Sequence, residues 1–251
     1  MRLENKVAVI TGGSSGIGLA TAQDFISEGA SLCICGRHQE ALDKARNLLG
    51  EDVLYIQSDI TNLNDLEKLF SDTEARFGKI DVLMANAGEV KFMPIEFFDE
   101  AGFDDVTSSS FKGTFFTIQK ALPHLNNNAS IIVLSATGQS MGFPASTVTA
   151  ANKAAIRSLA RGISADLLPT RGIRVNCISP GPVETPLFDK LGLLEEQVEG
   201  MKEGFKKLIP LKRLGRPEEV AKVASFLASD ESSFVIGEEI KVSGGEGNLR
   251  I

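Results

Sequence analysis

Short apolar runs alternate along the chain with longer stretches whose apolar residues recur at helical spacing. The runs are rich in Val, Ile and Leu, and they comprise Val7–Thr11, Ser31–Cys35, Val53–Gln57, Val82–Ala85, Ser130–Ser135, Arg174–Ile178 and Glu239–Val242. Helical spacing follows the first three runs, over Ile17–Glu28, Gln39–Leu49 and Leu63–Phe77. Fully apolar strands are typical of a parallel sheet that is covered on both faces. The alternation predicts an α/β fold, a single-domain Rossmann-type, doubly wound parallel sheet of about seven strands with helices on both faces.

The whole chain, residues 1–251, fits one such domain, because α/β folds often reach this length as a single unit. No Pro/Gly/Ser linker or internal repeat interrupts the pattern. Only residues 182–208 lack a clear alternation, and their position predicts a flap over the substrate, with a surface excursion as the alternative. The apolar residues of this segment predict either an apolar ligand or a helix packed on the body, and they are Phe188, Leu191, Leu193, Leu194, Val198, Met201 and Phe205.

Charge and cysteine usage narrow the partners that the protein can have. The formal net charge is −7 and no basic block occurs, which argues against a nucleic-acid partner. Cys33, Cys35 and Cys177 lack the spacing of metal ligands, so we expect no metal site and buried thiols in a reducing compartment. The apolar run after Lys6 is too short for a signal-peptide core or a membrane span, so we expect a cytoplasmic protein without membrane contact.

A glycine-rich turn directly follows the first predicted strand and leads into the first predicted helix. Its spacing is Gly-x-x-x-Gly-x-Gly, and its candidate contact residues are Gly12, Ser14, Ser15, Gly16, Ile17 and Gly18. Glycines allow a tight turn and a close approach of the backbone to a pyrophosphate, while the helix N-terminus offers free N–H groups and a positive dipole end. Because the turn joins a strand to a helix, the pattern predicts a dinucleotide site.

The end of the second predicted strand distinguishes between the two nicotinamide dinucleotides. A site that prefers NAD(H) places a carboxylate there to hold the ribose hydroxyls. This chain has Gly36, Arg37 and His38 instead, so nothing repels a 2′-phosphate and the Arg37 guanidinium can bind it. We therefore predict NADP(H) in preference to NAD(H). The alternative is that Arg37 is a solvated loop charge.

Over nearly its whole length the chain resembles the short-chain dehydrogenase/reductase family. The resemblance rests on the turn Thr11–Gly18, on Asn86-Ala87-Gly88 after the fourth strand, on Pro180-Gly181, and on the closing segments Arg213–Val220 and Ser243-Gly244-Gly245. It implies that Asp59 contacts adenine and that the segment from Pro180 to Thr185 holds the nicotinamide amide. Beyond the glycine turn and Arg37, the cofactor contacts that it implies are Asp59, Ile60, Asn86, Ala87, Gly88, Lys153, Pro180, Gly181, Val183 and Thr185.

The chain departs from this family at the catalytic positions. The family uses a Tyr, a Lys four residues later, a Ser thirteen residues before the Tyr, and an upstream Asn. Lys153 matches the Lys, but Thr149 occupies the Tyr position, Ala136 the Ser position and Ser110 the Asn position. A Thr hydroxyl is a far weaker acid than a phenol, and losing a positioned general acid typically costs about 10²–10⁴ in rate. Ordinary carbonyl reduction by this set of residues should therefore be slow.

Nearby polar residues are candidates to replace the missing groups, although each is better explained as a loop or surface residue. These candidates are Ser135, Thr137, Gln139, Ser140, Glu89, Lys91 and Glu184. His38 and His124 are expected away from the reaction centre, at the adenosine end and at the far side. The only tyrosine, Tyr55, lies on the third strand, where we expect it to pack rather than react.

Three functions fit these observations. The first is an NADP(H)-dependent oxidoreductase that acts on a small carbonyl or alcohol substrate at a non-standard active site. The second is a non-redox enzyme on the same scaffold, such as a cyclase, isomerase or lyase. The third is a catalytically inactive regulatory protein that binds NADP(H). The resemblance also implies a homodimer or homotetramer.

Overall fold

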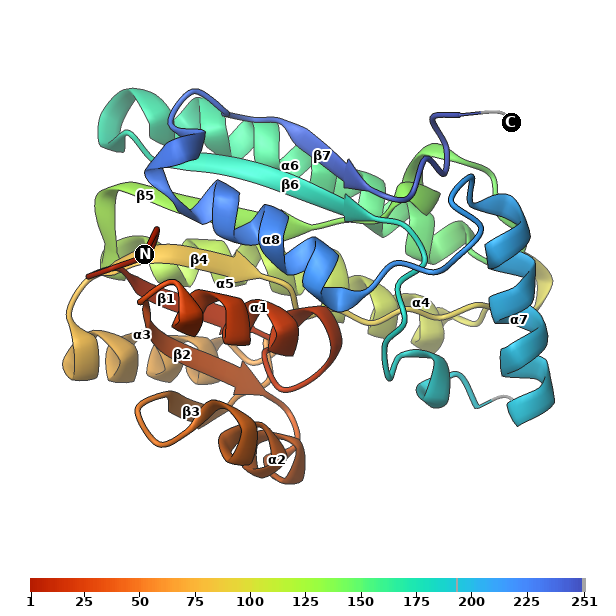
Figure 1. The fold of residues 1–251 in the computed structure, drawn as a ribbon, viewed down its shortest axis with the longest axis horizontal. Coiled ribbons are helices and arrows are strands. Elements are labelled where there is room, and N and C mark those ends of the chain that lie inside the picture. Colours follow the sequence, from red (N-terminus) through yellow and green to blue (C-terminus); the bar gives the residue numbers. More distant parts are fainter. Residues whose placement is uncertain (193, 250–251) are drawn as a thin grey trace.

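The computed structural model describes residues 1–192 and 194–249. Its centre is a seven-stranded parallel sheet in the order β3-β2-β1-β4-β5-β6-β7 (Figure 1). The strands are β1 (Val7–Thr11), β2 (Ser31–Gly36), β3 (Leu54–Gln57), β4 (Ile80–Ala85), β5 (Leu125–Leu134), β6 (Arg174–Pro180) and β7 (Glu239–Val242). The predicted fold class is confirmed, and the strands differ from the predicted runs only at their ends.

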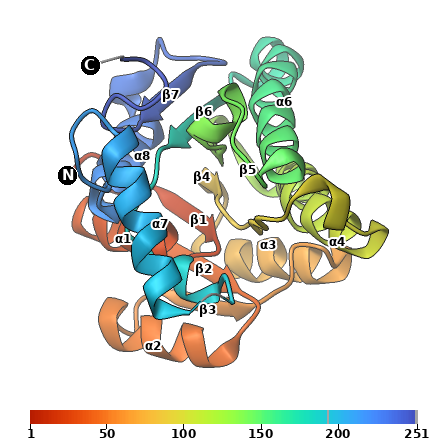
Figure 2. The same cartoon turned by 90° about the vertical axis from the view of Figure 1, so that its right-hand side faces the viewer.

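Helices cover both faces of the sheet, as Figure 2 shows along the strand direction. One face carries α1 (Gly16–Ser27), α2 (Gln39–Leu49) and α8 (Pro217–Ala228). The other carries α3 (Leu63–Phe77), α5 (Gly113–Ala121) and α6 (Thr147–Arg171), with α4 (Glu100–Thr107) packed beside α6. Each layer has its own buried apolar cluster against the sheet, which explains why the central strands are predominantly apolar.

The chain reverses its strand order between β1 and β4. From β1 it proceeds outward to β2 and β3, and it then returns to β4 on the other side of β1. The loops that follow β1 and β4 therefore diverge at the carboxyl ends of these two strands. Ligands of open α/β sheets bind in the crevice at such a switch point. The topology thus places the glycine turn after β1 and Asn86-Ala87-Gly88 after β4 at one site.

The segment predicted as a flap contains a helix that the sequence pattern does not reveal. It begins with the short turn Phe188–Lys190 and continues into α7 (Glu195–Leu208), which lies beyond the carboxyl ends of the strands (Figure 1). Phe188 and Val198 are buried with Ile209 and Leu214 in a small cluster separate from the main core. Leu194 is exposed, and the predicted apolar contact at Leu193 lies outside the described residues.

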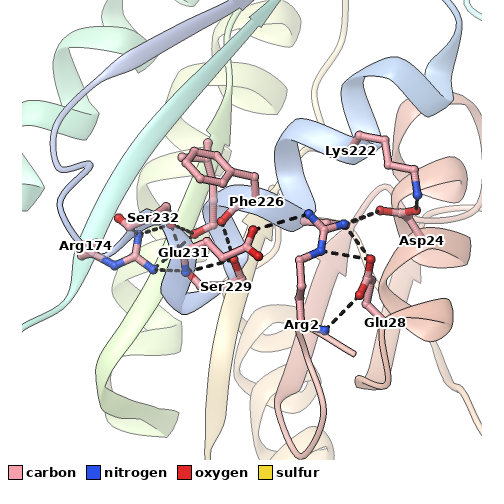
Figure 3. Close-up of polar contacts among 11 residues, drawn as sticks. Arg2, Asp24, Glu28, Arg174, Lys222, Phe226, Ser229, Glu231 and Ser232 are labelled. Carbon is pink, nitrogen blue, oxygen red and sulfur yellow. Dashed lines mark hydrogen bonds and ion pairs between the residues drawn. The ribbon is translucent and has the colours of Figure 1, made fainter.

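A polar network ties the elements together at the opposite end of the sheet (Figure 3). The buried guanidinium of Arg174, at the start of β6, donates hydrogen bonds to the carbonyl oxygens of Leu227, Ser229 and Ser232. These carbonyls lie in and just after the last turn of α8, where a cation opposes the negative end of the helix dipole. Arg2 reaches Glu28 nearby. The network stabilises the fold away from the crevice at the switch point.

Three further observations on the described residues concern membrane-spanning helices, metal-binding clusters and the cysteines. Within residues 1–192 and 194–249, no helix combines the length and the apolar character that a membrane crossing requires. The same residues contain no cluster of three or more His, Cys, Asp or Glu side chains suited to a metal ion. Cys33, Cys35 and Cys177 are buried free thiols, and burial raises the pKa of each.

Candidate active site

A groove of about 650 Å³ opens at the switch point, and the glycine turn forms its floor. Gly12 and Gly16 adopt left-handed backbone conformations with φ of 65° and 54°, which favour glycine. A Cβ atom at Gly18 would lie 2.2 Å from the carbonyl oxygen of Gly12, so only glycine fits where α1 approaches the turn. The turn thus presents bare backbone and the N-terminus of α1 to the groove, as a pyrophosphate requires.

Asn86 holds the glycine turn in place from the neighbouring strand. Its side-chain Nδ2 donates to the carbonyl oxygens of Thr11, at 2.9 Å, and Gly12, at 3.1 Å. The backbone N–H groups of Asn86 and Ala87 both donate to the Thr11 hydroxyl. The segment Asn86-Ala87-Gly88 is therefore built into the wall of the groove.

Basic side chains gather at the end of the groove beside β2. Arg37 and His38 follow this strand, and Lys44 of α2 lines the same wall. The Arg37 side chain is about half exposed, and its Nη1 lies 3.8 Å from Oε2 of Glu89 across the groove. A phosphate at this end would meet a half-exposed guanidinium and a second cation. Lys44 was not predicted, because only the turn of α2 brings it to the groove.

The residues predicted to contact the cofactor divide between this groove and an adjoining cavity. Those that line the groove are Gly12, Ser14, Ser15, Gly16, Ile17, Gly18, Arg37, Asp59, Ile60, Asn86, Ala87, Gly88 and Thr185. Those that line the adjoining cavity alone are Lys153, Pro180, Gly181 and Val183. Ile17, Asn86, Gly88 and Thr185 line both spaces, so the groove and the cavity are contiguous.

The adjoining cavity has a volume of about 280 Å³ and mostly apolar walls. Ala136, at the end of β5, lines it together with Thr149 and Lys153, which lie one turn apart on α6. Three positions predicted from the catalytic motif thus meet in one space. Phe143, Phe188 and Phe205 form an aromatic wall opposite them, and the rings of Phe143 and Phe205 stack with centroids 5.6 Å apart.

Lys153 is buried in the wall of this cavity. Its Nζ donates a hydrogen bond to the carbonyl oxygen of Leu134 at 3.0 Å. Loss of hydration on burial lowers the pKa of Lys153 to about 8. A Cβ atom at Gly88 would lie 3.6 Å from Nζ, so the ammonium group borders the junction with the groove.

The hydroxyls that replace the missing catalytic groups are engaged with backbone. The hydroxyl of Thr149 donates to the carbonyl of Lys91 at 3.0 Å and accepts from the N–H of the same residue. Ser110 lies in a π-helical turn, Ser108–Lys112, and its hydroxyl donates to the carbonyl of Glu89 at 3.0 Å. Each hydroxyl has one proton, so neither is free to protonate a substrate without breaking its contact.

The other candidate polar residues also have structural partners. Ser135 donates to the carbonyl of Lys153, and Ser140 donates to the carbonyl of Thr137. The Gln139 amide is held by Glu239 and Arg157. Glu184 pairs with Lys202 of α7, outside the cavity.

Lys91 and Glu89 were candidates for the site, whereas Tyr55 and His124 were expected away from it. Lys91 and Glu89 do not line the cavity, although Glu89 borders the groove. Tyr55 lies on the outermost strand, β3, and donates its hydroxyl to the carbonyl of Gly50. His124 pairs with Glu74 of α3.

Glu246 is a cavity residue that the sequence analysis missed. It follows the turn after β7, is only 6% exposed, and accepts a hydrogen bond from the Thr137 hydroxyl at 2.6 Å. Burial raises the pKa of its carboxyl group. A signal was present, because a charged residue directly follows Ser243-Gly244-Gly245 at the carboxyl end of a predicted strand.

Comparisons with known proteins agree with this fold. The family described as enoyl-(acyl carrier protein) reductase matches residues 12–246. Oxidoreductase asL5 of Sarocladium schorii is 44% identical over 246 residues, covering 97% of this chain and 96% of that protein. The NADP-dependent (R)-specific alcohol dehydrogenase of Lentilactobacillus kefiri is 34% identical over 250 residues, with 97% of each chain covered.

A solved structure extends the likeness to three dimensions. The short-chain dehydrogenase/reductase from Brucella melitensis described as a glucose/ribitol dehydrogenase superposes with a TM-score of 0.91 at 34% identity, covering 100% of this chain and 99% of that one. The fold and the crevice define a Rossmann-type dinucleotide-binding protein. The chain belongs to the short-chain dehydrogenase/reductase family of oxidoreductases.

Proposed function

We propose that the protein is an NADP(H)-dependent oxidoreductase that acts on a small carbonyl or alcohol substrate at a non-standard active site. The observation that carries this proposal is the contiguity of the two spaces. The groove over the glycine turn and the apolar cavity share Ile17, Asn86, Gly88 and Thr185, with Lys153 at their junction. A dinucleotide in the groove would present one end to a ligand in the cavity.

The described residues fit such a cofactor from end to end. The backbone of the glycine turn and the N-terminus of α1 would hold the pyrophosphate, because a Cβ atom at Gly18 would fill the space beside Gly12. Asp59 and Ile60 would contact adenine. Pro180, Gly181, Val183 and Thr185 would hold the nicotinamide amide, and Lys153 would bind the ribose next to it.

Arg37 supports NADP(H) rather than NAD(H). No carboxylate stands at the end of β2, and Arg37, His38 and Lys44 make this end of the groove basic. A planar guanidinium can bind a 2′-phosphate through two parallel hydrogen bonds. The relative from Lentilactobacillus kefiri is itself described as NADP-dependent.

A nicotinamide bound in the groove would supply hydride-transfer chemistry to a carbonyl or alcohol group in the cavity, and the accompanying proton would come from the substrate, the flap or water. The ammonium of Lys153 would orient the cofactor ribose and place a positive charge beside the reacting oxygen. Phe188, Leu191 and Phe205 of the segment 182–208 line the cavity, so we propose that this segment is the substrate flap and excludes water. Ala136 offers no hydroxyl to the substrate oxygen, which is why the site is non-standard.

We also propose a homodimer or homotetramer in the cytoplasm. Exposed apolar side chains support self-association, among them Phe97, Phe103, Phe115 and Phe234. The three free, buried thiols suit a reducing compartment. Light scattering on the purified protein would determine the oligomeric state.

The proposal is tested by binding first and turnover second. Titration with NADPH and NADH, followed by nucleotide fluorescence, should show saturable binding and a preference for NADPH. Oxidation of NADPH is then measured against a broad panel of ketones and aldehydes. Absence of NADPH binding would refute the cofactor assignment. Binding without oxidation by any substrate would favour a non-redox or regulatory role, for which the engaged hydroxyls of Thr149 and Ser110 argue.

A further inference from the structure

The cavity contains one buried carboxyl group, that of Glu246. Lys153 and Glu246 are the titratable side chains among the described residues that line this space. Glu246 reaches it because the turn after β7 packs against the loop after β6, where a Cβ atom at Gly181 would lie 3.1 Å from Oε2 of Glu246. Within residues 1–192 and 194–249, no cation forms an ion pair with this carboxyl group. A buried carboxyl group with one hydroxyl partner is costly, and its position in a cavity points to a ligand.

Thr137 fixes the direction of this carboxyl group. Its hydroxyl lies 2.6 Å from Oε2 of Glu246 and 3.3 Å from the carbonyl oxygen of Pro180. The other carboxyl oxygen, Oε1, has no hydrogen-bond partner among the described residues. A carboxyl group held on one side can accept a hydrogen bond on the other without losing further side-chain freedom.

The two titratable groups together restrict the charge of a ligand. A charged ligand would be attracted by one of these groups and repelled by the other, so it would gain little to offset the hydration that its own charge loses in this low-dielectric space. The remaining wall is apolar and includes Phe143, Phe188 and Phe205. An uncharged molecule with an apolar frame and a hydrogen-bond donor satisfies all three conditions.

We propose that Glu246 and Thr137 form the polar recognition site of the cavity, which binds a hydroxyl group of an uncharged, otherwise apolar substrate. This hydroxyl is additional to the reacting carbonyl or alcohol group, so the inference rests on the proposed function and names its substrate class. Glu246 acts as a specificity-determining residue. Its carboxyl oxygen accepts the hydroxyl proton in a hydrogen bond, and no proton is transferred.

Binding of three matched probes to the protein saturated with NADP⁺ tests this proposal. The probes are 1-tetralone, 4-hydroxy-1-tetralone and 4-oxotetralin-1-carboxylate, and calorimetry or ligand-observed NMR measures their affinities. We expect the hydroxyketone to bind at least about fivefold more tightly than the plain ketone, as one added hydrogen bond predicts. The carboxylate should not bind detectably. Equal affinities for the two ketones, or binding of none of the probes, would overturn the inference.

Two substitutions separate recognition from a structural role. Glu246→Leu should abolish the preference for the hydroxyketone, whereas Glu246→Gln should keep part of it and admit the carboxylate probe. A preference that survives in Glu246→Leu would refute the assignment. If Glu246→Leu does not fold, the Glu246→Gln variant alone tests the inference. Binding of the carboxylate probe by this variant would support the inference, and failure to bind it would overturn the inference. NADPH affinity, measured first on each variant, tests the cofactor proposal separately.

Discussion

The ammonium group of Lys153 donates a hydrogen bond to the carbonyl oxygen of Leu134 inside the cavity, with 3.0 Å between the two atoms. This single hydrogen bond offsets only part of the hydration that the ammonium loses on burial. The hydration that is not replaced lowers the pKa of Lys153 to about 8. Lys153 is thus held charged at neutral pH in a place that disfavours its charge, as expected of a residue kept for a ligand.

Lys153→Met should therefore stabilise the free protein near pH 7. The unfolded chain keeps its lysine pKa near 10.5, so the folded state carries the full penalty below pH 8 and loses it as pH rises from about 8 to 10.5. A shift of this size corresponds to about 3 kcal/mol, less about 1 kcal/mol for the lost hydrogen bond. Urea denaturation at pH 7 should show a gain of about 1–3 kcal/mol for the variant, with NADPH affinity reduced.

The pH dependence of this gain is the decisive observation. The advantage of Lys153→Met should shrink as pH rises from about 8 and level off above about pH 10.5, where both folded and unfolded wild-type chains are mostly neutral at this position. Lys68→Met, at an exposed position on α3, provides the control and should show no such trend. A stability difference that does not change between pH 7 and 10 would contradict the burial argument.

Gly18→Ala should destroy the nucleotide groove. The added Cβ would lie 2.2 Å from the Gly12 carbonyl oxygen and 2.7 Å from Nδ2 of Asn86. The glycine turn and the Asn86 side chain that holds it must therefore both move. We expect NADPH affinity to fall by about 100-fold or more, since the pyrophosphate contacts depend on this backbone. Fluorescence titration measures the loss.

Gly162→Ala is the matched control for this substitution. Gly162 lies exposed in α6, where an added Cβ meets nothing within 4 Å. The variant should gain about 0.5–1 kcal/mol in unfolding free energy and bind NADPH as wild type does. Unchanged affinity in Gly18→Ala would mean that the groove does not hold the nucleotide.

Arg37→Asp should shift the cofactor preference from NADPH towards NADH. The aspartate would repel a 2′-phosphate and could accept hydrogen bonds from the ribose hydroxyls instead. We expect a fall of about 10- to 100-fold in NADPH affinity, by loss of a bidentate ion pair, with NADH affinity preserved or raised. Both dissociation constants are measured at one salt concentration.

Glu89→Gln provides a second test of the same contact. Glu89 lies 3.8 Å from Arg37 and competes with a phosphate for the guanidinium. Its neutralisation should therefore tighten NADPH binding and leave NADH binding unchanged. An unaltered NADPH affinity in Arg37→Asp would leave Arg37 as a solvated loop charge.

The fold could be predicted because its determinants are local. Apolar strands of four to ten residues that alternate with helical stretches specify a parallel sheet without knowledge of distant contacts. The errors in the predicted elements also arise because the prediction uses local patterns alone. The start of β5 was placed too late because Asn126, Asn127 and Asn128 interrupt its apolar run. The helix α7 was not predicted because its sequence is mostly polar and buries little. Val198 is its one buried residue among those described.

The candidate site was predictable only where a motif is contiguous. The glycine turn and the segment Asn86-Ala87-Gly88 could be recognised because strand ends in a parallel sheet meet at one edge. The role of Glu246 depends on Thr137, which lies 109 residues away, and no spacing rule reports that contact. The engagement of the Thr149 hydroxyl by the Lys91 backbone likewise depends on a loop that sequence patterns do not place.

Restoring the family's catalytic groups should create or raise reductase activity. The substitutions are Ala136→Ser, Thr149→Tyr and Ser110→Asn, beside the retained Lys153. A positioned general acid contributes about 10²–10⁴ in rate, so NADPH oxidation with a reactive ketone should rise by about 100-fold or more. Some stability should be lost, because the longer phenol side chain cannot keep both hydrogen bonds that the Thr149 hydroxyl makes to Lys91. A variant that binds NADPH normally without any gain would show that more than these groups is missing.

Arg174→Leu should destabilise the fold without touching the site. The buried guanidinium donates to the carbonyl oxygens of Leu227, Ser229 and Ser232 at the end of α8, and leucine would remove these charged hydrogen bonds (Figure 3). Each carbonyl oxygen would keep a weaker, uncharged donor. A hydrogen bond from a charged group contributes about 1.5–3 kcal/mol, and the loss of these bonds is partly offset because the buried charge is removed as well. We expect urea denaturation to show a loss of about 2–4 kcal/mol. Arg2→Leu, which removes the more exposed partner of Glu28 in the same network, should cost much less. Equal losses in the two variants would contradict this account, as would a reduced NADPH affinity in folded Arg174→Leu protein, because the network lies at the amino ends of the strands, opposite the groove.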